Sequence, residues 1–316
     1  DHAQGGIAAA IDPKDSFAAH IEDTYQAGAE LGKRQVIAEI ISSAPQLIQY
    51  LIDLGTDFTL RDPAYDICLE NLSLTMEGGH TRRRIAYAAD STGHQIMEAL
   101  IAQCRKNPNI DIFEYRIAID LITQHHIVQD EGFVPGISCW GAYVLETKEN
   151  KVDIFKARKT MLATGGAAQI YSPNTNPKVT TGDGMAMARL AGGRLANMEF
   201  VQFHPTAFWN PDGETFLISE SLRGEGAVLR LSDGSTFMEN YHPQGNLAPR
   251  DIVSRAIDSE LKKRGEKFCY LDATKVPSEQ LLKHFPSINS MLKAQSIDFT
   301  VDPIPVAPAA HYFCGG

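Results

Sequence analysis

The chain has 316 residues, of which 43% are hydrophobic and 22% charged, and its formal net charge is −10. This composition is ordinary for a globular protein with room for about two domains. An acidic chain without a long basic run repels a phosphate backbone, and no apolar run approaches a membrane span. We therefore expect neither nucleic acid nor a membrane as a partner.

The cysteines are scattered along the chain and never form a CxxC pair. This spacing argues against a disulfide framework or a zinc site and is typical of a reducing compartment. No signal peptide is visible. We expect a cytoplasmic protein without a metal site.

In chain order, residues 14–54 predict two helices, the first with Ser16 as its N-cap. A third helix is predicted to begin at Ser91-Thr92-Gly93 and to end near residue 107. Strands are predicted at residues 111–115, 118–123, 137–145, 152–156 and 160–163. Their pattern suits a parallel sheet joined to a small antiparallel sheet.

The segment Leu74–Arg84 has neither a helical nor a strand period, so we expect a loop. The glycine pair Gly78-Gly79 gives the backbone freedom to turn Glu77 and His80 toward a ligand. A solvated charged loop is the alternative interpretation.

Two glycine-rich turns indicate a ligand site. An apolar run at 161–163 closes on Thr164-Gly165-Gly166, which predicts a buried strand and a turn that allows close approach of a ligand. Thr181-Gly182-Asp183-Gly184 predicts a turn that opens a buried helix, with Asp183 as N-cap and free N–H groups.

The segment Glu199–Thr206 alternates apolar and polar residues. It predicts a strand that carries Gln202 and His204 and ends at Pro205. A helix N-terminus and a His-bearing strand so close in sequence suggest a cofactor beside a substrate.

Two further segments carry candidate site residues. Ser219 and Glu220 precede Arg223 and Glu225 at a Gly-x-Gly turn, and we favour a structural pair between Arg223 and Glu225. Arg250 falls in the first turn of a predicted helix, where the dipole prefers an anion. The alternative is that Arg250 forms a surface ion pair with its neighbour Asp251 and has no role in the site.

The ATGG, TGDGMAMA and EFxQFHPT segments together resemble the succinate dehydrogenase/fumarate reductase flavoprotein superfamily. Within it, the Glu77 loop and the order of the motifs resemble the L-aspartate oxidase family. The likeness runs from Ala3-Gln4-Gly5-Gly6 to His311-Tyr312. No G-x-G-x-x-G occurs in the chain, so we expect an internal fragment that lacks the N-terminal pyrophosphate-binding segment and the C-terminal part.

The resemblance implies an α/β fold: a partial FAD-binding Rossmann-like domain with a small antiparallel sheet, plus an α+β capping domain. We expect the incomplete FAD-binding domain at 1–196 and the capping domain at 197–312. At 313–316 we expect the chain to begin its return to the FAD-binding domain. FAD is expected to bind non-covalently, because His2 is at the wrong offset for the covalent link of the dehydrogenases.

The resemblance also implies roles for individual residues. Those expected at the flavin are Ala3, Gln4, Gly5, Gly6, Thr164, Gly165, Gly166 and Asp183. Those expected to bind substrate are Glu77, Gln202, Ser219 and Glu220. Those expected to be catalytic are Arg250, His204 and His311.

The implied reaction is oxidation of L-aspartate to iminoaspartate, the first step of NAD biosynthesis from aspartate. Glu77 would receive the substrate ammonium, and oxygen or fumarate would accept the electrons. A functional link to quinolinate synthase is expected. A succinate dehydrogenase or fumarate reductase flavoprotein subunit is the first alternative, and a non-catalytic protein of the same fold is the second.

Overall fold

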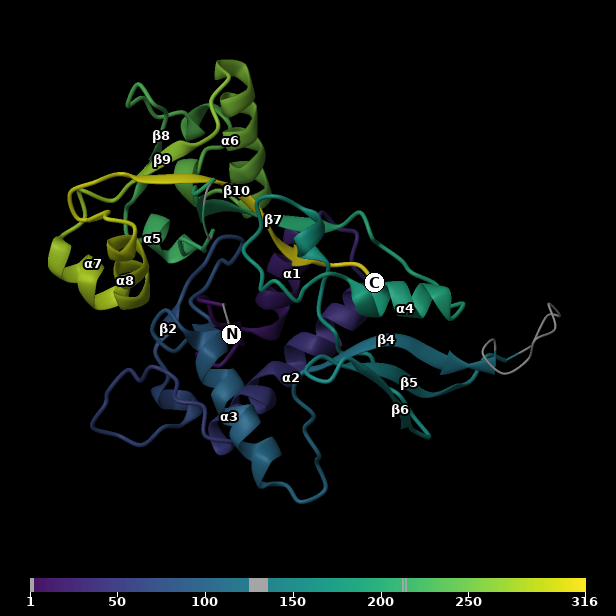
Figure 1. The fold of residues 1–316 in the computed structure, drawn as a ribbon. Coiled ribbons are helices and arrows are strands. Elements are labelled where there is room, and N and C mark those ends of the chain that lie inside the picture. Colours follow the sequence, from purple (N-terminus) through teal and green to yellow (C-terminus); the bar gives the residue numbers. More distant parts are fainter. Residues whose placement is uncertain (1–2, 125–135, 212, 214) are drawn as a thin grey trace. The chain divides into compact units, whose positions relative to one another are not determined.

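The computed structural model describes residues 3–124, 136–211, 213 and 215–316 (Figure 1). Two compact units make up the chain: Asp1–Asn107 with Phe203–Ala309, and Pro108–Gln202 with Ala310–Gly316. The domain boundaries expected at residues 196 and 312 stay a prediction.

The first part of the first unit packs helices around a small sheet. Its strands β1 (Ile7–Ala8), β3 (Ile85–Ala86) and β2 (Leu74–Thr75) lie in that order and are antiparallel. Its helices are α1 (Phe17–Ala27), α2 (Arg34–Asp53) and α3 (Thr92–Lys106). The core between them contains Ala9, Ile48, Phe58, Leu72 and Ala86.

The predicted helices of this part are confirmed. The hydroxyl of Ser16, with φ −151°, accepts the Ala19 N–H over 3.1 Å, so Ser16 is the N-cap of α1. The third helix begins at Thr92, directly after Ser91, and ends at Lys106.

The second part of the first unit is built on a four-stranded sheet in the order β7-β10-β9-β8. Its strands are β7 (Val201–Phe208), β8 (Val228–Arg230), β9 (Cys269–Asp272) and β10 (Ile304–Phe313). Its helices are α5 (Glu220–Gly224), α6 (Arg250–Arg264), α7 (Ser278–His284) and α8 (Pro286–Ala294). The core is a large buried cluster that includes Leu222, Val253, Ile257 and Leu271.

The strand predicted around Gln202 and His204 is β7, but it continues through Pro205 to Phe208. The prediction that it ends at Pro205 is wrong. Since β7 is the first strand in its sheet order, it is an edge strand, where a residue without an N–H is tolerated.

A buried carboxylate joins the two parts of the first unit. Asp90 accepts the backbone N–H of Ser287 over 2.9 Å, the Ser287 hydroxyl over 2.8 Å and the N–H of Ile288 over 3.4 Å. These donors belong to the first turn of α8. The carboxylate thus satisfies helix-terminal N–H groups that α8 cannot satisfy itself.

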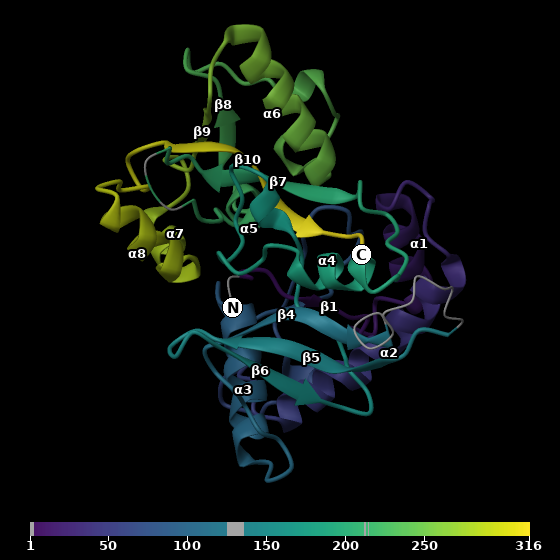
Figure 2. The ribbon, with the colours of Figure 1, turned by 45° about the vertical axis from the view of Figure 1, so that its right-hand side comes forward.

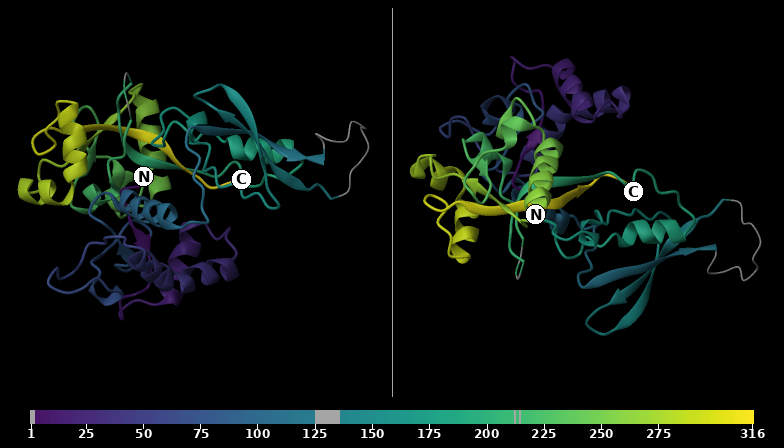
Figure 3. Two further views of the ribbon diagram at one scale, coloured as in Figure 1. Left: turned by 60° about the horizontal axis from the view of Figure 1, so that its bottom comes forward. Right: turned by 90° about the horizontal axis from the view of Figure 1, so that it is seen from above.

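The second unit contains the sheet β4 (Arg116–Thr123), β5 (Cys139–Glu146) and β6 (Lys151–Lys156), with the helix α4 (Asp183–Leu190) beside β4 (Figure 2). Both strand pairings are antiparallel (Figure 3). Three of the predicted strands are therefore confirmed.

The strands predicted at 111–115 and 160–163 are wrong, because neither segment is assigned a strand. The parallel sheet expected from them is accordingly not found in the described part of this unit. Met161 is 89% exposed. An apolar run predicts that a segment is buried, but it does not identify the residues that pack against it.

Short 3₁₀ helices at Leu69–Asn71, Ala168–Ile170, Met238–Asn240 and Gly245–Leu247 connect these elements. Among the described residues, no helix is both long enough and apolar enough to cross a bilayer. The five cysteines, Cys68, Cys104, Cys139, Cys269 and Cys314, are free thiols.

Candidate active site

The Glu77 loop lies against the start of α5. The N–H of Gly78 donates to Oε1 of Glu220 over 3.1 Å, and a Cβ on Gly78 would collide with that carboxylate. Gly79 adopts φ +82°, which favours glycine. Both glycines of the pair are therefore required, one for space and one for backbone conformation, as the prediction of a flexible turn implies.

Arg250, the first residue of α6, faces two carboxylates. Its Nε donates to Oε2 of Glu220 over 2.5 Å, and its Nη2 lies 3.5 Å from Oε2 of Glu77. The alternative of a surface pair with Asp251 is wrong, because Asp251 pairs with Arg255 over 2.7 Å. The structure thus unites three of the predicted site residues in one cluster.

The two carboxylates of this cluster have opposite pKa shifts. Burial raises the pKa of Glu77, and Glu220 adds to the rise while Arg250 opposes it. Burial also acts to raise the pKa of Glu220, but Arg250, Arg223 and the Gly78 N–H together lower it. Glu220 is thus the firmly ionised partner of Arg250, and Glu77 is the carboxylate more easily available to another cation.

Arg223 continues the cluster into the interior. Its Nη2 lies 3.7 Å from Oε1 of Glu220, and its Nη1 donates to the carbonyl oxygen of Asn246 over 2.5 Å. The predicted pair with Glu225 is wrong, because the Glu225 carboxylate contacts Gln280 and His284 instead. Burial lowers the pKa of Arg223, and Arg250 adds to this while Glu220 opposes it.

Ser219 and His204 flank this cluster. Ser219 is the N-cap of α5, and its hydroxyl accepts the Ser221 N–H over 3.3 Å. His204 is fully buried in β7, and its Nδ1 accepts the Thr206 N–H over 3.2 Å, so a neutral ring carries its proton on Nε2. One turn after Arg250, the Ser254 hydroxyl donates to the carbonyl of Phe203 over 2.9 Å and ties α6 to β7.

The residues Ala3–Gly6 lie on the same unit. The side-chain N–H of Gln4 donates to the carbonyl of Leu217 over 3.1 Å, whereas its Oε1 is buried without a partner among the described residues. A Cβ on Gly5 would lie 2.9 Å from Oε1 of Glu77, and one on Gly6 would collide with the backbone of Ala86. His2 lies outside the described residues.

In the second unit, the two predicted glycine turns pack together. Gly165 adopts φ +73°, and a Cβ on Gly184 would collide with the side chain of Thr164. A Cβ on Gly166 would lie 2.9 Å from Cβ of Phe313. These contacts require glycine for close packing in this turn.

The helix that follows, α4, is confirmed, but its N-cap is Gly182 with φ +83°. The N-cap prediction for Asp183 is wrong. Asp183 is instead the first helical residue, and its carboxylate accepts the Thr181 hydroxyl over 2.9 Å. The N-cap position here has positive φ, a conformation that favours glycine over aspartate.

His311 and Gln202 also belong to the second unit. Nδ1 of His311 lies 2.8 Å from the Thr175 hydroxyl, and the carbonyl of His311 accepts the side-chain N–H of Asn176 over 2.8 Å. Gln202 lies near the start of β7 and is partly buried. The predicted roles of these residues stay predictions.

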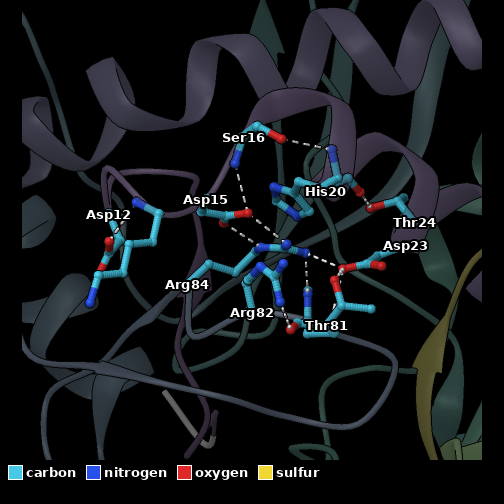
Figure 4. A network of polar contacts seen from close by, with 12 residues as sticks. Asp12, Asp15, Ser16, His20, Asp23, Thr24, Thr81, Arg82 and Arg84 are labelled. Carbon is cyan, nitrogen blue, oxygen red and sulfur yellow. Dashed lines mark hydrogen bonds and ion pairs between the residues drawn. The ribbon is translucent and has the colours of Figure 1, made fainter.

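The sequence reasoning missed a buried cluster at the end of the Glu77 loop (Figure 4). Arg84 has a fully buried side chain and pairs with Asp15 over 2.7 Å and with Asp23 over 2.6 Å. The alternative interpretation of this segment as a solvated charged loop does not hold for Arg84. Its two partners are Asp15, which precedes the N-cap of α1, and Asp23 within α1, and no local spacing relates them to Arg84.

Comparison with known proteins gives a consistent picture. A family described as FAD binding domain matches residues 1–316. L-aspartate oxidases from Pseudomonas aeruginosa and Yersinia pestis are both 46% identical to the chain, over 99% and 100% of its length, which is 58% of theirs. An E. coli quinol fumarate reductase structure is 30% identical, with a TM-score of 0.87, over 100% of this chain and 54% of that one.

These matches confirm the predicted resemblance, the fold class and FAD as the cofactor. The residues present fit a flavin. Gln4 keeps a buried acceptor atom without a partner among the described residues, and a donor group of a bound flavin could satisfy it. The FAD contacts predicted for Ala3–Gly6, Thr164–Gly166 and Asp183 stay predictions. The chain belongs to the FAD-binding domain family of flavoproteins.

Proposed function

We propose that this protein carries out FAD-dependent oxidation of L-aspartate to iminoaspartate, with oxygen or fumarate as the electron acceptor. The observation that supports this proposal most is the carboxylate of Glu77, 3.5 Å from Arg250 Nη2. A dicarboxylate substrate needs cationic and neutral donors, and a further carboxylate would repel it. An amino-dicarboxylate has an ammonium group that this carboxylate can bind.

The substrate carboxylates need donors, and we assign this role to Arg250, His204, His311, Ser219 and Gln202. The assignment of His311 and Gln202 rests on the resemblance alone. The ammonium is assigned to Glu77, with Glu220 nearby. Before substrate binds, the Glu77 carboxylate contacts Arg250. When the substrate ammonium binds Glu77, Arg250 remains paired with Glu220.

The oxidation removes a hydride from Cα and a proton from the ammonium nitrogen. When bound, FAD accepts the hydride. The chain's own residues move the proton. An arginine has a pKa above about 12 and is a poor base. Arg250 can accept a proton only as it passes one of its own to Glu220, which is 2.5 Å away. Arg223, 3.7 Å beyond, stabilises the ionised Glu220 before the transfer.

A flavoprotein subunit of a succinate dehydrogenase or fumarate reductase is the second candidate. It is favoured by the TM-score of 0.87 to the E. coli quinol fumarate reductase. The contacts among Arg250, Glu220 and Arg223 suit either reaction. The Glu77 carboxylate distinguishes the two, because succinate has no ammonium group.

The test is a substrate comparison on the full-length protein with bound FAD. L-aspartate and succinate are supplied in parallel with oxygen, and hydrogen peroxide and oxaloacetate plus ammonia, the hydrolysis products of iminoaspartate, are measured. We expect turnover of L-aspartate to exceed that of succinate by at least about 100-fold. Faster oxidation of succinate would reject the proposal in favour of the second candidate.

Two wider assignments accompany this proposal. Free thiols at all five cysteines are consistent with a reducing, cytoplasmic location. Iminoaspartate hydrolyses readily, so a downstream enzyme that condenses it, quinolinate synthase, is the proposed functional partner.

A further inference from the structure

Arg84 anchors the Glu77 loop to helix α1. Its guanidinium binds Asp15 with two parallel hydrogen bonds, Nε to Oδ2 over 2.7 Å and Nη2 to Oδ1 over 2.9 Å. Its Nη1 donates to Oδ2 of Asp23 over 2.6 Å and lies 3.2 Å from Nδ1 of His80. A two-point pair with a carboxylate fixes both the position and the plane of the guanidinium (Figure 4).

The same carboxylate of Asp23 also binds the loop directly. Its Oδ2 accepts the backbone N–H of Thr81 over 2.9 Å and the Thr81 hydroxyl over 2.8 Å. A backbone hydrogen bond joins the two ends of the loop, because the Arg84 N–H donates to the carbonyl of Thr75 over 3.1 Å. The loop is thus held at Thr81 and at Arg84 by one helix.

The other end of the loop carries the predicted ammonium-binding group. The carbonyl of Glu77 accepts the His80 N–H over 3.3 Å, so a tight turn connects Glu77 to the anchored residues. On the opposite side, the loop touches Glu220 through Gly78 and Arg250 through Glu77. Only three residues separate Glu77 from Thr81, and a shift of the anchor therefore moves the carboxylate.

The burial of this cluster carries a desolvation cost. Arg84 is fully buried, and taking a guanidinium and two carboxylates out of water is costly, so such clusters often stabilise no more than an apolar replacement would. Their benefit is a fixed geometry. Here the geometry that is fixed belongs to the loop that carries Glu77.

We infer that Arg84 is a positioning residue that sets the selectivity of the site for an amino-bearing substrate, by holding the Glu77 loop on Asp15 and Asp23. This inference rests on the proposed function, because Glu77 binds an ammonium group only in that reaction. Arg84 itself touches neither substrate nor flavin in this assignment. Its effect reaches the substrate through Thr81, His80 and the turn to Glu77.

The test uses Arg84→Lys and Thr81→Val in the full-length protein with FAD. Lysine keeps the charge but cannot form the two-point pair, and valine removes one hydrogen bond to Asp23. For L-aspartate oxidation we expect KM to rise by about 10-fold in Arg84→Lys and about 3-fold in Thr81→Val. For fumarate reduction by the same preparations we expect KM to stay within about 2-fold.

Arg82→Lys is the matched control, since Arg82 is exposed in the same loop and its Nη1 bonds only weakly, to the Thr81 carbonyl at 3.3 Å. We expect no change in either KM. Equal rises for both substrates, or none in either variant, would overturn the inference. If Arg84→Lys fails to fold, Thr81→Val alone decides. Wild-type protein that does not oxidise L-aspartate would instead reject the proposed function.

Discussion

Nε of Arg250 and Oε2 of Glu220 are 2.5 Å apart, although the two residues begin different helices and are 30 positions apart in sequence. A charge-assisted hydrogen bond of this length holds the guanidinium in place. It places a cation at a helix N-terminus, where the dipole disfavours it, and the buried carboxylate compensates.

Removal of the Arg250 guanidinium should abolish turnover without releasing the flavin. We expect Arg250→Leu to lower kcat by at least about 1,000-fold, because both carboxylate binding and the proton route are lost. Flavin absorbance after gel filtration should stay within about 20% of wild type, as no predicted FAD contact is altered. Arg255→Leu on the exposed side of α6 is the control and should leave both unchanged. Near-normal activity in Arg250→Leu would contradict the assigned role.

The Glu77 carboxylate should matter more for L-aspartate than for fumarate. We expect Glu77→Gln to reduce kcat/KM for L-aspartate oxidation by about 100-fold, because a neutral amide replaces the ion pair with the ammonium. Fumarate reduction should fall by less than about 5-fold. Glu98→Gln, at an exposed position of α3, is the control. A similar loss in both reactions would show that Glu77 acts on the cluster and not on the ammonium.

The pair formed by Glu220 and Arg223 should be strongly coupled in stability. Glu220→Gln leaves two guanidinium groups, those of Arg223 and Arg250, close together without their shared counter-ion. We expect a loss of about 3 kcal/mol in the free energy of unfolding. Arg223→Met in the same background should restore at least about 1 kcal/mol of it. A double-mutant cycle by urea denaturation measures the coupling, and strictly additive losses would refute it.

The first unit should lose stability between pH 6.5 and pH 4. Burial lowers the pKa of His20 to about 4, with the charges of Arg84 and His80 adding to the shift. In the unfolded chain His20 titrates near 6.5, so the unfolded state binds the proton first and the stability contribution present above pH 6.5 is lost as the pH falls to 4.

We expect this contribution to reach roughly 2 kcal/mol. His80 adds to it in the same direction, because burial lowers its pKa as well. Urea denaturation at pH 7 and pH 4.5 should show a smaller difference for His20→Asn than for wild type. His94→Asn on the exposed face of α3 should behave like wild type. An identical pH difference in His20→Asn and wild type would exclude His20 as the cause.

Local signals in the sequence were sufficient for the helices and for the glycine turns. Ser16 has the chemistry of an N-cap and is one, and the glycine pair Gly78-Gly79 predicts the turn that contacts Glu220. Arg250 was recognised as an unusual cation at a helix start. The Ser16 cap and the glycine turn depend on interactions within a few residues. Arg250 stands out because a cation is unusual at the start of a helix.

Partners distant in sequence could not be predicted in this way. Arg223 was paired with Glu225, two residues on, but it lies beside Glu220 and Asn246 because the fold brings a 3₁₀ helix against α5. The partners of Arg84 could not be predicted, because Asp15 and Asp23 are more than sixty residues earlier. Tertiary contacts select these pairs, and the spacing of the residues along the chain does not predict them.

The carboxylate of Asp90 that caps α8 has a consequence for synthesis of the protein. It belongs to a unit whose two halves, Asp1–Asn107 and Phe203–Ala309, are separated in sequence by Pro108–Gln202 of the other unit. As the ribosome releases the chain from its N-terminus, the first half emerges long before Ser287 exists. The surface around Asp90 that meets α8 can therefore be covered only after Ser287 has been synthesised.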